Sequence, residues 1–166
     1  ILFVAGHETT ALALSWTWLL LSQHPAAWAK LRAELAEVLG GRAPGFEDVP
    51  RLRYTEQVIL ESMRLYPPAW SIGREAKEDV ELGGTTIPRG GQVWMMQWAM
   101  HRDPRHFPRP EAFEPERWEG DLQRKLPRGV YFPFGGGPRL CIGNSFAMTE
   151  LVLVLASLAR RWRPRV

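Results

Sequence analysis

Clusters of proline and glycine divide this chain, and the long stretches between them carry the apolar periodicity of helices. Proline suits the first turn of a helix, as at Pro25, while a following proline pair such as Pro67-Pro68 ends one. The pattern predicts helices over Ile1 to about Ser22, Ala26 to Leu39 and Leu52 to Leu65. The first of these has few charges, and we expect it to be mostly buried.

The period changes after the third helix. Short runs rich in β-branched and aromatic residues predict strands over Ser71–Ala76, Val80–Leu82, Thr85–Ile87 and Gln92–Met96. Gly83-Gly84 is typical of a hairpin turn. Recurring prolines from residue 101 to 132 indicate an irregular stretch with at most short helices, and a last apolar helix is expected over Asn144 to about Trp162. The fold class is therefore mainly α with a minor β region.

Composition narrows the class of protein. An apolar content of 45% and a charged content of 23% are ordinary for a globular domain. A single cysteine excludes an internal disulfide framework and fits a reducing compartment. The net charge of +3 is small. The arginines near the C-terminus suit a helix end or, alternatively, an acidic partner, and we expect no nucleic-acid partner. The apolar run Ala11–Leu21 is too short to span a bilayer, and we expect a cytoplasmic location.

Cys141 lies in the segment Phe134-Gly-Gly-Gly-Pro-Arg-Leu-Cys-Ile-Gly143, just before the last helix. Glycines let a backbone approach a flat ligand closely, and Arg139 can pair with an anionic group. A lone cysteine is often only a small buried hydrophobe. Zinc needs about four ligands, and a phosphate loop needs a Gly-Lys-Ser/Thr that is absent here. A single thiolate can nevertheless hold a haem iron.

A second motif, Ala5-Gly-His-Glu-Thr-Thr10, places polar groups within an apolar helix. One interpretation is a polar stripe on the helix that faces solvent. In the other interpretation, Gly6 leaves room for a planar ligand, while Glu8 and Thr9 supply an acid and a hydroxyl for a proton relay. Thr9 can also bond back to a carbonyl and loosen the helix locally.

Two further motifs involve arginine. Glu61-Ser-Met-Arg64 is an i,i+3 pair, worth only about 0.2–0.5 kcal/mol on a helix surface. Arg117, in Phe113-Glu-Pro-Glu-Arg-Trp118, has the planar fork that binds a carboxylate at two points. Burial of Glu61 distinguishes a surface pair from a buried cluster, in which losing one member costs several kcal/mol.

Taken in their order along the chain, the four motifs resemble the C-terminal half of cytochrome P-450, the haem-thiolate monooxygenases. Phe134 to Gly143 matches the F-x-x-G-x-R-x-C-x-G signature, and Glu61 to Arg64 is similar to the E-x-x-R helix. The segment from Ala5 resembles the long distal helix, Pro115-Glu-Arg-Trp118 resembles P-E-R-F, and His101-Arg-Asp-Pro104 also resembles a family segment. The resemblance implies that residues 1–166 are a C-terminal fragment of one such domain, without its N-terminal half and final strands.

The resemblance also implies roles. Cys141 would be the axial ligand of heme b, within the loop from Phe134 to Gly143, with dioxygen as co-substrate. Arg139 and Arg74 would pair with the haem propionates. Further implied roles are proton delivery by Glu8 and Thr9, room for oxygen at Gly6, a structural salt-bridge triad of Glu61, Arg64 and Arg117, and an apolar substrate pocket lined by Phe3, Ala5, Ala69, Trp70 and Ile72.

The implied activity is insertion of one oxygen atom into a small organic substrate, with electrons from a partner such as a ferredoxin or a flavin reductase. One alternative is a haem-thiolate protein that performs peroxide-dependent oxidation or isomerisation, in which the acid–alcohol pair is often altered. Another alternative is a non-catalytic remnant without haem, which serves only as a helical interaction module.

Overall fold

A computed structural model describes residues 2–165, and its helices and small antiparallel sheets confirm the predicted fold class. The α-helices are α1 (Leu2–Gln23), α2 (Pro25–Leu39), α3 (Arg53–Leu65), α4 (Gln97–Met100), α5 (Leu122–Lys125) and α6 (Asn144–Ala159). The strands are β1 (Ile72–Glu75), β2 (Val80–Leu82), β3 (Thr85–Ile87) and β4 (Gln92–Met95). Short 3₁₀ turns are η1 (Phe46–Arg51), η2 (Pro115–Trp118) and η3 (Gly137–Arg139).

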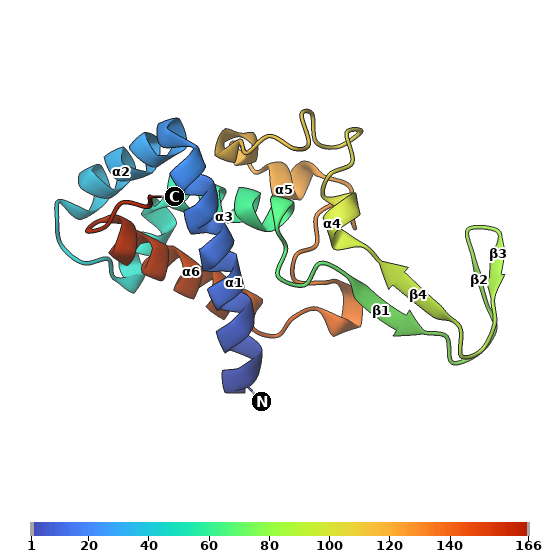
Figure 1. The fold of residues 1–166 in the computed structure, drawn as a ribbon. Coiled ribbons are helices and arrows are strands. Elements are labelled where there is room, and N and C mark those ends of the chain that lie inside the picture. Colours follow the sequence, from blue (N-terminus) through green and yellow to red (C-terminus); the bar gives the residue numbers. More distant parts are fainter. Residues whose placement is uncertain (1, 166) are drawn as a thin grey trace.

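The long helices form one body, from which the strands project (Figure 1). β1 pairs antiparallel with β4, and β2 with β3. The β2–β3 hairpin extends from the far end of the β1–β4 ribbon (Figure 1). Its turn glycines, Gly83 and Gly84, have φ values of 58° and 81°, the left-handed conformation that a two-residue hairpin of this kind requires.

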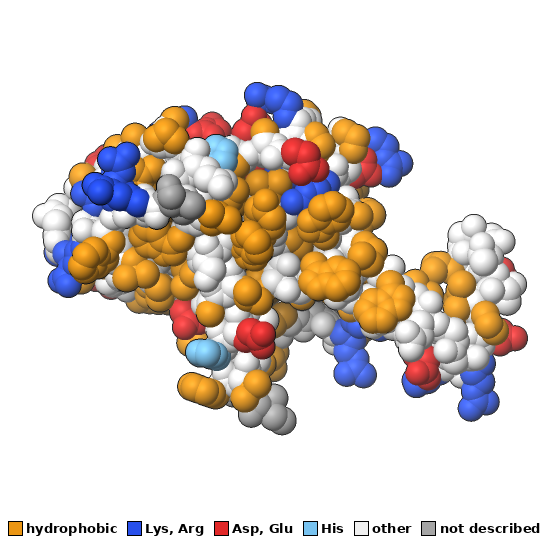
Figure 2. Space-filling view, viewed as in Figure 1, with side chains coloured by type: hydrophobic (Ala, Val, Ile, Leu, Met, Phe, Trp, Pro, Cys, Tyr) orange, Lys and Arg blue, Asp and Glu red, His pale blue; other side chains and the backbone are white. Residues whose placement is uncertain are grey.

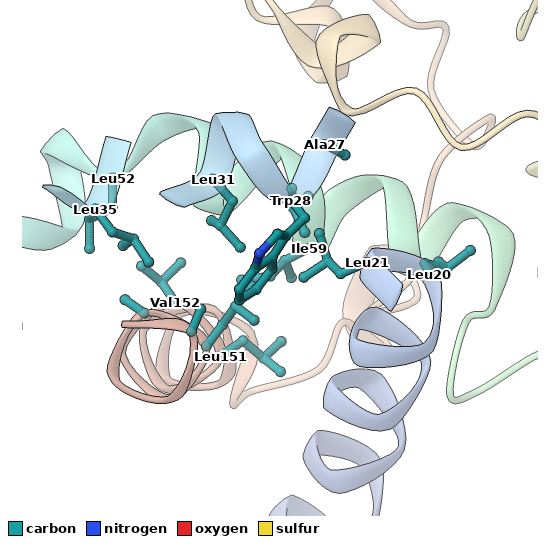
Figure 3. Packing of buried hydrophobic residues seen from close by; sticks show 14 of the residues in the cluster. Leu20, Leu21, Ala27, Trp28, Leu31, Leu35, Leu52, Ile59, Leu151 and Val152 are labelled. Atoms are coloured by element: carbon teal, nitrogen blue, oxygen red, sulfur yellow. The ribbon is translucent and has the colours of Figure 1, made fainter. Parts of the chain in front are cut away.

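The hydrophobic core lies where α2, α3 and α6 meet (Figure 3). Leu31 of α2, Ile59 of α3 and Leu155 of α6 have no exposed surface. The Trp28 ring lies among these side chains and is 8% exposed. Burying such residues removes apolar surface from water, which is the main force holding helices together.

The expectation that the first helix is mostly buried is wrong. Its buried residues are confined to positions such as Ala13, Thr17 and Leu21, while Phe3 is 83% and Val4 73% exposed. Only one face of α1 meets α3 and α6, and its N-terminal turns extend beyond the core (Figure 1). Figure 2 shows this end of the helix as a projection that carries hydrophobic surface.

The end of α6 receives a cation from another helix. Arg32 of α2 donates from Nη1 to the carbonyl oxygens of Ala159 and Arg160, at 2.6 and 2.5 Å. Carbonyls in the last turn of a helix have no partner within it and carry partial negative charge, so a guanidinium there is favourable.

The start of α3 is capped by a side chain from α2. Leu52, which precedes α3, has no capping group of its own. Instead the Glu34 carboxylate accepts hydrogen bonds from the Tyr54 N–H at 2.5 Å and the Thr55 N–H at 2.9 Å, and from Thr55 Oγ1 at 2.7 Å. The carboxylate thus satisfies backbone N–H groups that the helix leaves free and joins α2 to α3.

We expect Glu34→Ala to lower the free energy of unfolding by about 1–2 kcal/mol, because it leaves these N–H groups without their acceptor. Denaturant unfolding of the full-length protein measures the change. Glu37→Ala, on the exposed side of the same helix, is the matched control and should stay within about 0.5 kcal/mol of wild type. Equal effects of the two variants would contradict the capping role.

Candidate functional site

A cavity of about 1230 Å³ opens between α1, β1, the cysteine loop and α6. Small-molecule pockets usually measure roughly 300–1,000 Å³, so this one has room for a large cofactor together with a substrate. Its lining is mostly apolar. The predicted site residues that line it are Ala5, Gly6, Thr9, Ala69, Ile72, Arg74, Phe134, Arg139, Cys141 and Gly143.

The loop that carries Cys141 is closed by its own backbone. The Cys141 N–H donates to the Phe134 carbonyl oxygen at 2.9 Å. Gly135 and Gly137 adopt φ values of 76° and 65°, a left-handed conformation that favours glycine. Gly143 then leads into α6, and a Cβ on that glycine would lie only 3.9 Å from Cys141 Sγ. The loop therefore presents an exposed thiol at the cavity wall, just ahead of a helix N-terminus.

The thiol lies three residues before Asn144, the first residue of α6. A thiolate is the form of cysteine that binds a metal.

The α1 wall of the cavity holds the second motif. No atom lies within 4 Å of the place where a Cβ on Gly6 would point, so the backbone there is open to a ligand. Thr9 Oγ1 donates to the Ala5 carbonyl oxygen at 2.9 Å, as the sequence suggested. The next hydroxyl, on Thr10, lies 3.5 Å from Glu150 Oε2 of α6. Glu8 is exposed and does not line the cavity as formed by residues 2–165.

Two guanidinium groups stand at the same cavity. Arg74 belongs to β1 and Arg139 to η3, and both residues line the cavity. The acid next to Arg74, Glu75, pairs with Lys77 at 3.0 Å instead. Within residues 2–165 no carboxylate lies in salt-bridge range of Arg74 or Arg139, which leaves both cations available to an anionic ligand.

The arginine motifs meet in a buried cluster away from the cavity lining. Glu61 and Arg64 have no exposed surface, and the Arg117 side chain is 7% exposed. Glu61 Oε2 accepts from Arg64 Nε at 2.9 Å, and Oε1 accepts from Arg117 Nε at 3.0 Å. The same carboxylate also accepts from the Trp118 indole at 2.9 Å and from the Glu114 N–H at 3.0 Å. Glu61, Arg64 and Arg117 therefore form a buried cluster, and the Glu61–Arg64 contact is not a surface ion pair.

Arg64 also organises the irregular segment beyond α4. Its Nη1 donates to the carbonyl oxygens of His101 and Pro110, at 2.9 and 2.7 Å, and its Nη2 to that of Ala112 at 3.0 Å. One guanidinium thus holds three backbone carbonyls that no helix or strand would satisfy.

Some predicted pocket residues do not reach this cavity. Phe3 is 83% and Trp70 58% exposed, and neither lines it. Conversely, the cavity includes Phe146, Ala147, Glu150 and Leu151 of α6, which the sequence reasoning did not select. Their spacing from Gly143 follows one helix face, and that periodicity could have identified them.

Within the part of the chain that the structure describes, none of the helices combines the length and the apolar character needed to cross a membrane.

The fold and the site define a mainly helical protein in which a single thiol stands at the wall of a large, mostly apolar cavity. A family model of cytochrome P450 matches residues 1–166, and the chain belongs to that family.

Similar proteins support the same family membership. Cyclooctatin synthase of Streptomyces melanosporofaciens is 52% identical over 164 residues, which cover 99% of this chain and 36% of that protein. Cyclooctat-9-en-7-ol 5-monooxygenase of the same organism is 48% identical over 162 residues, 98% of this chain and 35% of that protein. Pentalenene oxygenase of Streptomyces avermitilis is 38% identical over 162 residues, 98% of this chain and 36% of that protein. The chain therefore spans about a third of the length of these relatives.

Proposed function

We propose that this chain is the C-terminal part of a haem-thiolate monooxygenase that oxidises a small apolar substrate. The observation that carries the proposal is the joint position of Cys141, Gly6 and Thr9 at one large cavity. Family membership supports the same class of activity, since two of the relatives named above are a monooxygenase and an oxygenase.

The residues at the cavity fit a haem. The exposed Cys141 thiol would hold the iron, and the open backbone at Gly6 leaves space on the α1 side of the cavity. Arg74 and Arg139, which have no carboxylate partner among residues 2–165, would bind the two propionates. When bound, haem would supply the activation of dioxygen, with one oxygen atom inserted into the substrate and the other released as water.

Thr9 and Glu8 would bring protons to the cavity. The Thr9 hydroxyl donates to Ala5 in this structure, and rotation about its side-chain bond would turn that proton toward a group in the cavity. Glu8 is the preceding residue and is exposed, so it would exchange protons with solvent and relay them toward the hydroxyl. This pair also favours monooxygenation over the peroxide-dependent alternative, because reduction of dioxygen takes up protons from outside the cavity that peroxide already carries.

The substrate that fits best is an apolar cyclic compound. The α1 and α6 walls contribute Ala5, Ala13, Phe146 and Leu151, with Ile72 from β1. The relatives' names refer to cyclooctatin, cyclooctat-9-en-7-ol and pentalenene. Electrons would come from a ferredoxin or a flavin reductase.

The test is the spectrum of the full-length protein after reduction under carbon monoxide. Thiolate ligation gives a strongly red-shifted Soret band. A protein that binds haem without that band would not be a haem-thiolate enzyme, and a protein that binds no haem would be a remnant. Turnover with isotopically labelled dioxygen then decides the reaction, since a monooxygenase leaves one labelled atom in the product.

We expect Thr9→Ala to separate oxygen consumption from product formation. Without the hydroxyl, proton delivery fails and reduced oxygen leaves as hydrogen peroxide, so the product formed per electron pair falls by roughly ten- to a hundredfold or more. Oxygen uptake, peroxide release and product are measured together. Thr9→Ser keeps the hydroxyl and serves as the control; unchanged coupling in the alanine variant would remove Thr9 from the proton route.

A further inference from the structure

Two buried side chains, one on α4 and one at its C-terminal end, form hydrogen bonds with the backbone of Phe132, just ahead of the cysteine loop. Gln97 and His101 lie one helical turn apart, and neither has exposed surface. Gln97 Nε2 donates to the Phe132 carbonyl oxygen at 2.6 Å, and the Phe132 N–H donates to His101 Nε2 at 3.0 Å. Both backbone hydrogen-bonding groups of Phe132 are therefore held by one face of a short helix.

His101 is suited to this role because its ring stays neutral. Burial lowers the pKa of His101 to about 3, and the positive charges of Arg64 and Arg102 act in the same direction. Since Nε2 accepts the Phe132 N–H, the ring proton lies on Nδ1. The acceptor is thus preserved over the whole neutral pH range.

The same histidine is fixed from the other side by the buried cluster. Its carbonyl oxygen accepts from Arg64 Nη1 at 2.9 Å, so Glu61 and Arg64 set the position of the α4 C-terminus. The His101 ring also lies against the Tyr131 ring, with centroids 4.9 Å apart.

Phe132 in turn begins the turn that leads to the thiol. Its carbonyl oxygen accepts from the Gly135 N–H at 2.9 Å, and two residues further on the Phe134 carbonyl accepts from the Cys141 N–H at 2.9 Å. A continuous series of contacts therefore joins the buried ion pair to the cysteine loop through His101 and Phe132.

We propose that Gln97 and His101 are positioning residues that fix the cysteine loop, and with it the Cys141 thiol, relative to the haem. The inference rests on the proposed haem-thiolate function and extends it to two residues outside the cysteine loop, of which Gln97 also lines the cavity. Their bonds to Phe132 hold the loop in the geometry that thiolate ligation needs, in the manner of outer residues that orient metal ligands elsewhere.

The test uses the full-length protein with bound haem. His101→Phe keeps a ring of similar shape but leaves the Phe132 N–H without its acceptor, and His101→Gln restores an acceptor. We expect His101→Phe to lose haem to an excess of a haem-scavenging apoprotein roughly ten- to a hundredfold faster than wild type. Its reduced, carbon-monoxide-bound spectrum should show part of the band intensity moved away from the thiolate position. His101→Gln should recover most of both properties.

Gln97→Met supplies a second variant that does not depend on the histidine. Phe132 keeps the Gly135 N–H as a donor to its carbonyl, so haem loss should accelerate less than in His101→Phe but remain measurable. His106→Phe, five residues along and outside this hydrogen-bond series, is the matched control and should behave as wild type.

The outcomes separate the two proposals. The positioning role alone is overturned if the wild type shows the thiolate band while His101→Phe and Gln97→Met keep the wild-type rate of haem loss and band position. That role is also overturned if the variants lose only thermal stability, or if His101→Gln is as defective as His101→Phe. Wild type that binds haem without the thiolate band instead overturns the proposed function. If His101→Phe does not fold, Gln97→Met decides, and wild-type haem loss in it overturns the positioning role.

Discussion

Cys141→Ser should abolish the red-shifted band of the reduced, carbon-monoxide-bound full-length protein. The exchange replaces only the sulfur, because the hydrogen bond from the residue 141 N–H to the Phe134 carbonyl is made by the backbone and survives. A serine hydroxyl has a far higher pKa than a thiol and gives no comparable anionic ligand at neutral pH. Product formation that depends on dioxygen should disappear with the band, because the Cys141 thiolate would give the bound haem its oxygen-activating chemistry.

Ser145→Ala is the matched control for Cys141→Ser. Ser145 is exposed in the first turn of α6, close in sequence to the thiol, and a change there tests whether any substitution near the loop disturbs the haem. We expect the control to keep the full band. A Cys141→Ser protein that also kept the band would show that another residue ligates the iron.

Glu61→Gln should lower the free energy of unfolding by about 3–5 kcal/mol. The change is nearly isosteric, so packing is conserved and the charge alone is removed. Arg64 would then be a buried cation without an anion, while Arg117 would keep only Glu114, at 3.1 Å. The new amide N–H₂ would also face donors where an acceptor had been. Denaturant unfolding of the full-length protein, followed by far-ultraviolet circular dichroism, gives the value.

The control for Glu61→Gln is Asp121→Asn. Asp121 pairs with Arg124 at 3.4 Å, and both side chains are exposed, at 72% and 84%. Removing such a surface charge should cost less than about 1 kcal/mol. A loss of similar size in both variants would show that the Glu61 cluster is no more important than a surface ion pair.

Most of the helical fold could be predicted because its signals are local. Pro25 begins α2, and Gly40 ends it in a left-handed conformation with φ of 56°. The strands β2 and β3 were predicted with their observed bounds. By contrast, η1 and α4 were missed, because four to six residues carry too little periodicity to distinguish a helical turn from coil.

Burial was harder to predict than secondary structure. The sequence of α1 is apolar around most of its circumference, and such a pattern does not reveal which face meets α3 and α6. For the same reason the exposed position of Phe3 could not be foreseen.

At the site, the motifs identified residues that carry their own chemistry, such as Cys141 and Arg139. They did not identify Gln97, and they marked His101 only as the start of a family segment, without a role. The role of these two residues depends on a backbone group far along the chain, at Phe132, and that contact has no sequence signal.

The carbonyls held by Arg64 bear on how this protein acquires its shape. The stretch after α4 contains little regular structure, and its path is set by oxygens that point at a single guanidinium on α3. These carbonyls would be better solvated by water without the guanidinium, so the folded path of the stretch depends on burial of the Glu61–Arg64 pair. Loss of Arg64 would therefore release the backbone at three separate points rather than break a single contact.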